Sequence, residues 1–506
     1  MGGRYGIFSE ILEPRLEEII REENIESIAN LMDGRLNTLF RYMLGDEFAG
    51  LFHTYLQLEA RCPHTIGYDR RAQRSAHPSN HLDHARDAWL QFLKLRATGF
   101  SVEAILKGGN TPEDTEEFSG YMNSSYWLAA QIAQGNEKVI EYLNQVLTSE
   151  NNVHRLQRWY LHAIAISGHR PLLELEGKLL LAAKLQEGLR QAIVETMDEG
   201  CPESYLYLFS IIYNNGLQRF ASVKRSIAVC TGIGEQDSSE RITNKYVELI
   251  WNFLNHPETA RNTLQSKDTV ELYLALWSIG FYDTDEIRAI VPDIIRKGAK
   301  HQIQTLLYFL RCTQSSQMNH LISKDAFEVW HDDPKVVAAI LPLYMDGLYL
   351  SRYSDNKEAP TLSDYFETPE EAVRHYGYLK QVYQSISAKE IYSPYVFPWD
   401  CVVLTRSDVV LKMAYIAWMT NDIRLREELC TYLPALESYN RASYIGIVLP
   451  RTESKVEQEY VLQSLGDRSA DIRDEAYKVL SEMSLSPEQY QHIEELLRFK
   501  YSEMRI

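Results

Sequence analysis

Apolar residues recur along most of this chain at the three- and four-residue spacing of an amphipathic α-helix. In such a helix, positions i, i+3, i+4, i+7 and i+8 fall on one face, which packs against a neighbour. One stripe of this kind consists of Leu156, Trp159, Tyr160, Ala163 and Ile164. Similar stripes follow at short intervals, and they predict roughly two dozen helices of about fifteen residues each. The expected fold class is all-α.

Three helix starts are marked by Ser or Thr followed by Pro and Glu. These motifs begin at Thr111, Thr368 and Ser486. The hydroxyl group accepts a hydrogen bond from a free backbone amide, Pro fits the first helical position, and Glu complements the positive end of the helix. We therefore expect helices to begin at the prolines of these motifs.

Three segments interrupt the helical pattern and are predicted to be irregular, namely 61–80, 351–367 and 388–400. A strand-like run at 396–404 contains Pro398, which argues against a central β-strand. The interruptions predict four parts, which are an N-terminal helical region (1–110), a helical repeat array (111–350), an irregular linker with a helix (351–400) and C-terminal repeats (401–506).

The middle of the chain shows a repeat with a period of 33 residues. The aligned positions are Val270, Leu274 and Trp277, then Ile303, Leu307 and Leu310, then Val336, Ile340 and Leu343. A second apolar helix is expected after each of the first two. One helix pair in about 33 residues is the period of a stacked array in which each pair buries its inner face on its neighbours.

Residues 456–480 form the clearest repeat, with two helices joined by a Gly-Asp-Arg-Ser turn. Ala476 is small enough for two helices to approach closely, and Asp467 can pair with Arg473 between stacked turns. The segment resembles a HEAT repeat, whose characteristic positions are occupied by Leu465, Asp467, Ile472, Arg473, Ala476 and Leu480. This resemblance implies a HEAT-like α-solenoid, a right-handed superhelix of stacked helix pairs.

A second resemblance covers more of the chain. It rests on the segments 195–200 (ETMDEG), 202–208 (PESYLYL), 217–223 (LQRFASV), 231–232 (TG) and 495–501 (ELLRFKY). These are similar to the helical N-terminal region of large uncharacterised bacterial proteins that end in a domain similar to the molybdate metabolism regulator. The resemblance implies a bacterial protein with no known active site in this region. It also predicts that the chain is the N-terminal part of a longer protein.

The composition is that of a folded protein, with 45% hydrophobic and 24% charged residues among 506. The net charge of −18 argues against nucleic acid or an anionic membrane as the main partner, because both repel an acidic surface. No apolar stretch reaches the length of a membrane-spanning helix or of a signal-peptide core. Position 6 is Gly, so the myristoylation pattern is incomplete. We expect a cytoplasmic protein without a membrane partner.

Potential metal ligands gather in residues 53–86, which hold five of the fourteen histidines. The candidate ligands for a tetrahedral zinc ion are Cys62, His64, His81 and His84. The usual paired spacings CxxC and HxxxH are absent here, so these side chains are expected to be solvated and no metal site is predicted. The six cysteines of the chain contain no CxxC pair, and we expect buried free thiols in a reducing compartment.

The same segment carries an island of positive charge in an acidic chain. Its members are Arg61, Arg70, Arg71, Arg74 and Arg86. Arginines grouped in this way can bind phosphate or an acidic partner. The favoured alternative is that they dock against acidic helices of the same chain.

Two further motifs approach catalytic signatures without matching them. Gly232-Ile233-Gly234 lacks the third Gly and the preceding strand of a dinucleotide-binding loop. His331-Asp332-Asp333, with His320 upstream, resembles the His-Asp doublet of metal phosphohydrolases, but Pro334 follows at once and predicts the end of one helix and the start of the next. We therefore expect no catalytic residues, no cofactor and no enzyme activity.

Two classes of function remain. The first is a non-catalytic interaction scaffold that binds a protein or peptide on the concave face of its stacked helices. The second is a module for nucleic acid or a metal that uses the Arg- and His-rich segment 53–86, against which the acidic net charge counts. The sequence favours the scaffold.

Overall fold

The computed structural model describes 23 α-helices, three short 3-10 helices and one two-stranded sheet. The described residues are 15, 18–19, 22, 34–59, 61–62, 92–93, 95–96, 99–106, 122–149, 155–183, 185–231, 244–282, 284–313, 316–353, 358–387, 391–394, 401–450, 452–483 and 485–497. The prediction of an all-α protein is confirmed. None of the helices within these residues has both the length and the apolarity to cross a membrane.

The chain divides into two compact units, which we call the N-terminal unit and the C-terminal unit. The N-terminal unit is Met1–Ile290 with Cys312–Ser315, and the C-terminal unit is Val291–Arg311 with Ser316–Ile506. This division by compactness falls inside the predicted array 111–350. The four parts predicted from the sequence stay a prediction about repeat organisation.

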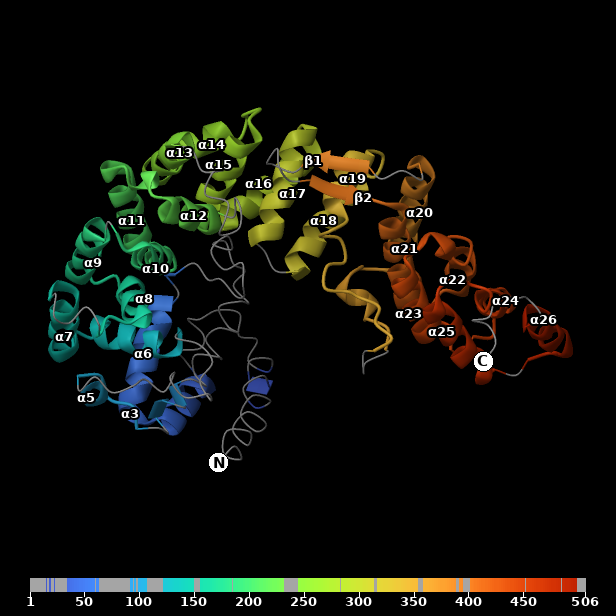
Figure 1. Cartoon of the computed structure of the whole chain (residues 1–506), viewed down its shortest axis with the longest axis horizontal. Helices are drawn as coiled ribbons and strands as arrows, with labels where there is room; N and C mark the ends of the chain where they lie inside the picture. The colour runs from blue at the N-terminus through green and yellow to red at the C-terminus, as the bar shows by residue number, and fades with distance from the viewer. Residues whose placement is uncertain are drawn as a thin grey trace. The chain divides into compact units, whose positions relative to one another are not determined.

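The N-terminal unit is built from helices that stack in two rows (Figure 1). Its helices are α3 (Gly34–Glu59), α5 (Val102–Leu106), α6 (Met122–Ala133), α7 (Glu137–Thr148), α8 (Arg158–Ser167), α9 (Arg170–Ala182), α10 (Glu187–Asp198), α11 (Pro202–Asn215), α12 (Ala221–Cys230), α13 (Asn244–Asn255), α14 (Pro257–Thr263) and α15 (Thr269–Tyr282). Each even-numbered helix from α6 to α12 contacts the next even one, and each odd-numbered helix from α7 to α15 contacts the next odd one. Helix α14 contacts both α13 and α15. Contact between alternate helices is the pattern of stacked helix pairs.

Helix α8 shows why the rows hold together. Its predicted stripe is buried at Trp159, Tyr160, Ala163 and Ile164, and the residues between them are buried as well. A helix that is apolar on all sides belongs in an interior layer. Contacts with α6 and α10 in the same row and with α9 in the other row supply that environment.

The C-terminal unit repeats this plan from α21 onward. Its elements are α17 (Lys300–Thr313), α18 (Ser316–Trp330), α19 (Pro334–Ile340), α20 (Pro369–Ser385), β1 (Ile391–Pro394), β2 (Cys401–Leu404), α21 (Arg406–Thr420), α22 (Ile423–Leu429), α23 (Ser438–Val448), α24 (Lys455–Ser464), α25 (Ala470–Ser481) and α26 (Pro487–Leu497), while α16 (Thr284–Lys297) spans the boundary between the units. Helices α21, α23 and α25 contact one another in order, and so do α22 and α24. Alternate helices again form rows.

The positions of the predicted 33-residue repeat all lie in the interior. The first three are on α15, the next three on α17 and the last three on or directly after α19, and all nine side chains are buried. The intervening helices are α16 and α18, as the pattern predicted. The 33-residue period therefore corresponds to alternate helices that bury equivalent positions.

Two of the three predicted helix starts are confirmed, and the third, Thr111, lies outside the described residues. Thr368 Oγ1 accepts a hydrogen bond from the Glu371 amide at 3.2 Å at the start of α20. Ser486 Oγ accepts one from the Gln489 amide at 3.3 Å at the start of α26. Both helices begin at the Pro of the motif.

The irregular segment predicted at 388–400 contains a strand that the pattern did not predict. Strand β1 pairs antiparallel with β2, with Ile391 opposite Leu404 and Pro394 opposite Cys401. The ladder ends at Pro394, and Pro398 lies in the connection between the strands. A two-stranded hairpin tolerates this arrangement because neither proline has to donate inside a central strand.

The HEAT-like segment adopts its predicted helices as α24 and α25, and Ala476 is fully buried. The side-chain pair suggested for Asp467 with Arg473 is wrong. The Asp467 carboxylate instead pairs with Arg441 at 2.6 Å, and Arg473 donates to the backbone carbonyls of Asp467 and Arg468 at 2.9 Å each. Arg441 lies on α23, which packs against α25, so Asp467 joins neighbouring helices of one row.

Candidate binding site

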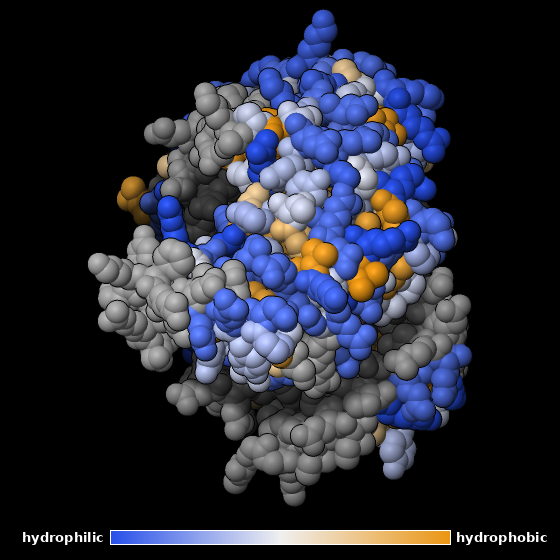
Figure 2. Space-filling view, turned by 90° about the vertical axis from the view of Figure 1, so that its right-hand side faces the viewer, coloured by the Kyte–Doolittle hydropathy of each residue, from blue (hydrophilic) through white to orange (hydrophobic). Residues whose placement is uncertain are grey.

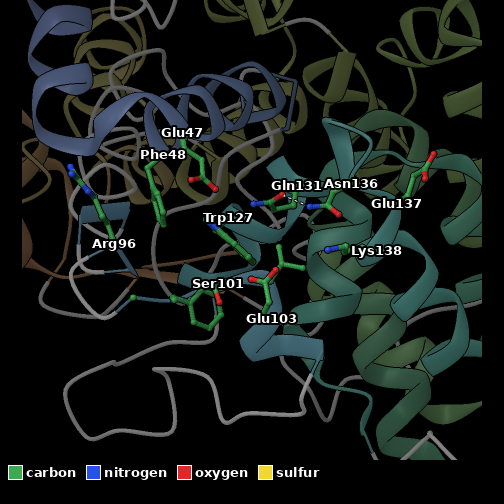
Figure 3. A pocket seen from close by; sticks show the side chains of 13 residues that line it. Glu47, Phe48, Arg96, Ser101, Glu103, Trp127, Gln131, Asn136, Glu137 and Lys138 are labelled. Carbon is green, nitrogen blue, oxygen red and sulfur yellow. Dashed lines mark hydrogen bonds between the residues drawn. The ribbon is translucent and has the colours of Figure 1, made fainter.

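The N-terminal unit contains a pocket of about 590 Å³ that opens between α3, α5, α6 and α7 (Figure 3). Its lining residues come from four separate segments and are Glu47, Phe48, Arg96, Gly99, Phe100, Ser101, Val102, Glu103, Trp127, Gln131, Asn136, Glu137 and Lys138. The volume is within the range that encloses a side chain or a small ligand.

A break in α3 forms one wall of the pocket. Gly45 has φ 74° and ψ 164°, which divides α3 into two helical segments. Glu47 and Phe48 therefore lie at the start of the second segment. Arg96 donates a hydrogen bond to the carbonyl of Met43, which the break leaves without its helical partner. A side chain at position 45 would be strained by the positive φ and would press against the Arg96 guanidinium.

The turn between α6 and α7 forms the opposite wall. Asn136 caps α7, because its Oδ1 accepts a hydrogen bond from the Val139 amide at 3.4 Å. The Nδ2 of the same side chain donates to Gln131 Oε1 at 3.0 Å. This contact fixes the amide of Gln131, whose Nε2 makes no hydrogen bond within the described residues.

The floor of the pocket is aromatic. Trp127 and Phe100 are buried, with ring centroids 5.0 Å apart in an edge-to-face contact. The indole Nε1 of Trp127 is buried and has no hydrogen-bond partner among the described residues. In Figure 3 this nitrogen lies on the side of the ring that faces Glu47 and Gln131. A buried N–H without an acceptor is costly.

The rim of the pocket is charged and acidic. Three carboxylates, those of Glu47, Glu103 and Glu137, stand against the two cations Arg96 and Lys138. All five residues are exposed, and Arg96 is already bound to the Met43 carbonyl. An acidic rim over aromatic rings attracts a cationic group, since both carboxylates and ring faces stabilise positive charge.

The structure tests little of the site predicted at 53–86. Cys62 is buried, and Arg61 pairs with Glu203 at the start of α11. Docking of Arg61 on an acidic helix end of the same chain agrees with the favoured reading of the arginine island. The other predicted metal or anion ligands lie outside the described residues, namely His64, His81, His84, Arg70, Arg71, Arg74 and Arg86.

Two further cysteines, together with Asp333 and His320, have structural surroundings. Cys201 and Cys430 are buried free thiols, and burial raises the pKa of each to about 12. Asp333 caps α19 through the amides of Lys335 and Val336, as the Asp-Pro sequence predicted. His320 accepts from the Met345 amide and contacts the Tyr365 carbonyl at 2.8 Å, which gives its ring a packing role.

Comparison with protein families matches residues 5–506 to a family of unknown function, DUF5724. The chain belongs to this family. No curated protein and no solved structure gave a match.

The sequence pattern does not predict the pocket of this DUF5724 protein, for a physical reason. The acidic residues 47, 103 and 137 have the pattern of ordinary surface positions near helix starts, whereas Trp127 has the pattern of a core residue. Only the fold brings these side chains together. Gly45 and Asn136 were the available signals, since Gly inside a helical pattern indicates a break and Asn before Glu indicates a cap. Neither indicates a ligand.

Proposed function

We propose that this DUF5724 protein is a non-catalytic, HEAT-like α-solenoid that binds a protein partner, and that its N-terminal pocket takes a basic side chain of that partner. The stacking of alternate helices in both units supports the solenoid. Scaffolds of this architecture present extended binding surfaces because each helix pair adds a similar face. The acidic rim over an aromatic floor is the observation that carries the choice of ligand.

The pocket offers both kinds of polar partner that a basic peptide needs. Glu47, Glu103 and Glu137 can bind the ammonium or guanidinium group. The Trp127 N–H and the Gln131 amide can donate to a backbone carbonyl next to that side chain. A free ammonium ion would use only the carboxylates, so a peptide segment fits the pocket better.

Charge and surface character support the same choice. The net charge of −18 attracts a basic partner at long range and speeds its association. The described residues on the face seen in Figure 2 are largely hydrophilic, and the hydrophobic ones among them form small groups. The described residues of that face therefore do not form a broad apolar docking surface. The pocket, in contrast, combines buried aromatic side chains with charged ones.

The proposal predicts which variants lose peptide binding. Binding of the tripeptides Ac-Gly-Lys-Gly-NH₂ and Ac-Gly-Arg-Gly-NH₂ to the full chain is measured by NMR titration, with Ac-Gly-Glu-Gly-NH₂ as the acidic comparison. The double variant Glu47→Gln/Glu103→Gln should weaken basic-peptide binding about three- to tenfold, as expected for two exposed ion pairs. Salt should weaken it in the wild type as well.

Glu141→Gln is the matched control, because Glu141 is an exposed carboxylate on α7 outside the pocket. It removes the same kind of charge and should leave binding unchanged. Equal binding of the acidic tripeptide, or equal losses in the pocket and control variants, would show that the pocket does not select a basic side chain.

A further inference from the structure

Three potential metal ligands meet between α18 and α20 in the C-terminal unit. Glu371 and His375 are four residues apart on α20 and so share one helix face, while Glu328 comes from the last turn of α18. One ligand atom from each of the three lies within 4.8 Å of the other two. The cluster is separate from the pocket of the N-terminal unit.

His375 gives the cluster a buried nitrogen that makes no hydrogen bond of good geometry among the described residues. The side chain is fully buried, and its Nδ1 lies 2.9 Å from the hydroxyl of the equally buried Tyr344. Its Nε2 lies 3.4 Å from Glu328 Oε1 but makes no hydrogen bond among the described residues. When Nδ1–H donates to Tyr344, the Nε2 lone pair faces the carboxylates, as in metal-binding histidines held by a hydrogen bond at the other nitrogen.

Hydrogen bonds hold the two carboxylates in place. Glu371 accepts from Lys324 Nζ at 2.9 Å and from the Glu367 amide at 2.6 Å, one on each oxygen. Glu328 accepts from Arg374 Nη2 at 2.7 Å. An ionised carboxylate has about four acceptor positions, so each retains capacity for a cation. The basic partners balance the charge of the cluster, and the Arg374 side chain, which is 49% exposed, is free to move into solvent.

We propose that Glu328, Glu371 and His375 form a binding site for a first-row divalent cation, Zn²⁺ or Mn²⁺. One imidazole nitrogen with two carboxylate oxygens suits these ions, whereas Mg²⁺ prefers oxygen ligands alone. Ligand distances of about 2.0–2.2 Å require the carboxylates to move inward by roughly 1 Å. Arg374 leaves Glu328 as the ion enters. Three protein ligands leave coordination positions for water.

The full chain is first treated with a chelator to remove bound metal. Binding of Zn²⁺ and Mn²⁺ is then measured by calorimetry and by thermal melting. Because His81 and His84 could hold zinc independently, the background is the His81→Ala/His84→Ala variant. We expect one ion per chain and a raised melting temperature, since binding favours the folded state. Glu371→Gln should weaken binding more than tenfold, and Mg²⁺ should not compete.

Arg374→Gln makes the test independent of misfolding, because this half-exposed side chain can be replaced without disturbing the core. It removes the competing cation, so Zn²⁺ should bind about threefold tighter or more. His331→Gln is the control, since His331 stacks on Tyr378 outside the cluster and should leave affinity unchanged. Absence of binding, or equal affinity in wild type, Glu371→Gln and Arg374→Gln, would overturn the proposal.

Discussion

Replacing Gly200 with Ala should destabilise the N-terminal unit by about 3 kcal/mol, at the upper end of overpacking substitutions. Gly200 lies at the junction of α10 and α11 against α8. A Cβ atom there would lie 2.5 Å from the carbonyl oxygen of Ala165 and 2.7 Å from its Cβ. The obstacle is mostly backbone, and the neighbouring Cys201 amide donates to that same carbonyl at 3.0 Å. Relief would require α8 and α10 to move apart.

Gly188→Ala, in the first turn of α10, should have the opposite effect. A Cβ atom at Gly188 meets nothing within 4 Å. Ala should therefore stabilise α10 by about 0.5–1 kcal/mol through its higher helix propensity. Thermal melting of both variants checks the pair, and similar melting temperatures would show that α8 and α10 are not closely packed at Gly200.

Replacing Arg426 with Met should destabilise the C-terminal unit by about 3–5 kcal/mol. Arg426 on α22 binds Glu457 on α24 through two hydrogen bonds of 2.8 and 2.7 Å. The Glu457 side chain is fully buried. Without Arg426, the Glu457 carboxylate would be an uncompensated buried charge. The free-energy cost of such a charge exceeds what the intact ion pair contributes to stability. The double variant Arg426→Met/Glu457→Leu should therefore be more stable than Arg426→Met alone.

Arg424→Met is the matched control for Arg426. Arg424 lies in the same helix and pairs with Asp422 at 2.8 Å, but its side chain is 83% exposed against 13% for Arg426. Exposed pairs contribute about 0–1 kcal/mol, so its melting temperature should change little. Equal effects of the two substitutions in urea or thermal unfolding would mean that Glu457 is solvated.

Much of the fold follows from local pattern. The stripe around Trp159 and the capping motif at Thr368 predicted their helices because spacing and caps act within a few residues. The 33-residue period predicted buried positions such as Leu307 because stacking repeats the same environment. The β1–β2 hairpin was missed, since its strands are four residues long and lie beside prolines.

The candidate sites could not be predicted in the same way. Trp127 has the pattern of a core residue, and only the placement of Phe100 and Gln131 beside it shows a donor without an acceptor. Glu371 has the pattern of a helix-cap residue, and the approach of α18 adds Glu328 and the buried nitrogen of His375. The Asp467 pair failed for the same reason, because the competing Arg441 comes from another helix.

Photocrosslinking locates the basic side chain directly. The tripeptide Ac-Gly-Lys-Gly-NH₂, with one Gly replaced by photo-leucine, is irradiated with the full chain, and the modified residues are mapped by mass spectrometry. We predict crosslinks at Phe48, Phe100–Glu103 and Trp127–Lys138, which unlabelled basic tripeptide should suppress and the acidic tripeptide should not. Crosslinks spread over other helices, or suppressed equally by the acidic tripeptide, would contradict a pocket that binds a basic partner.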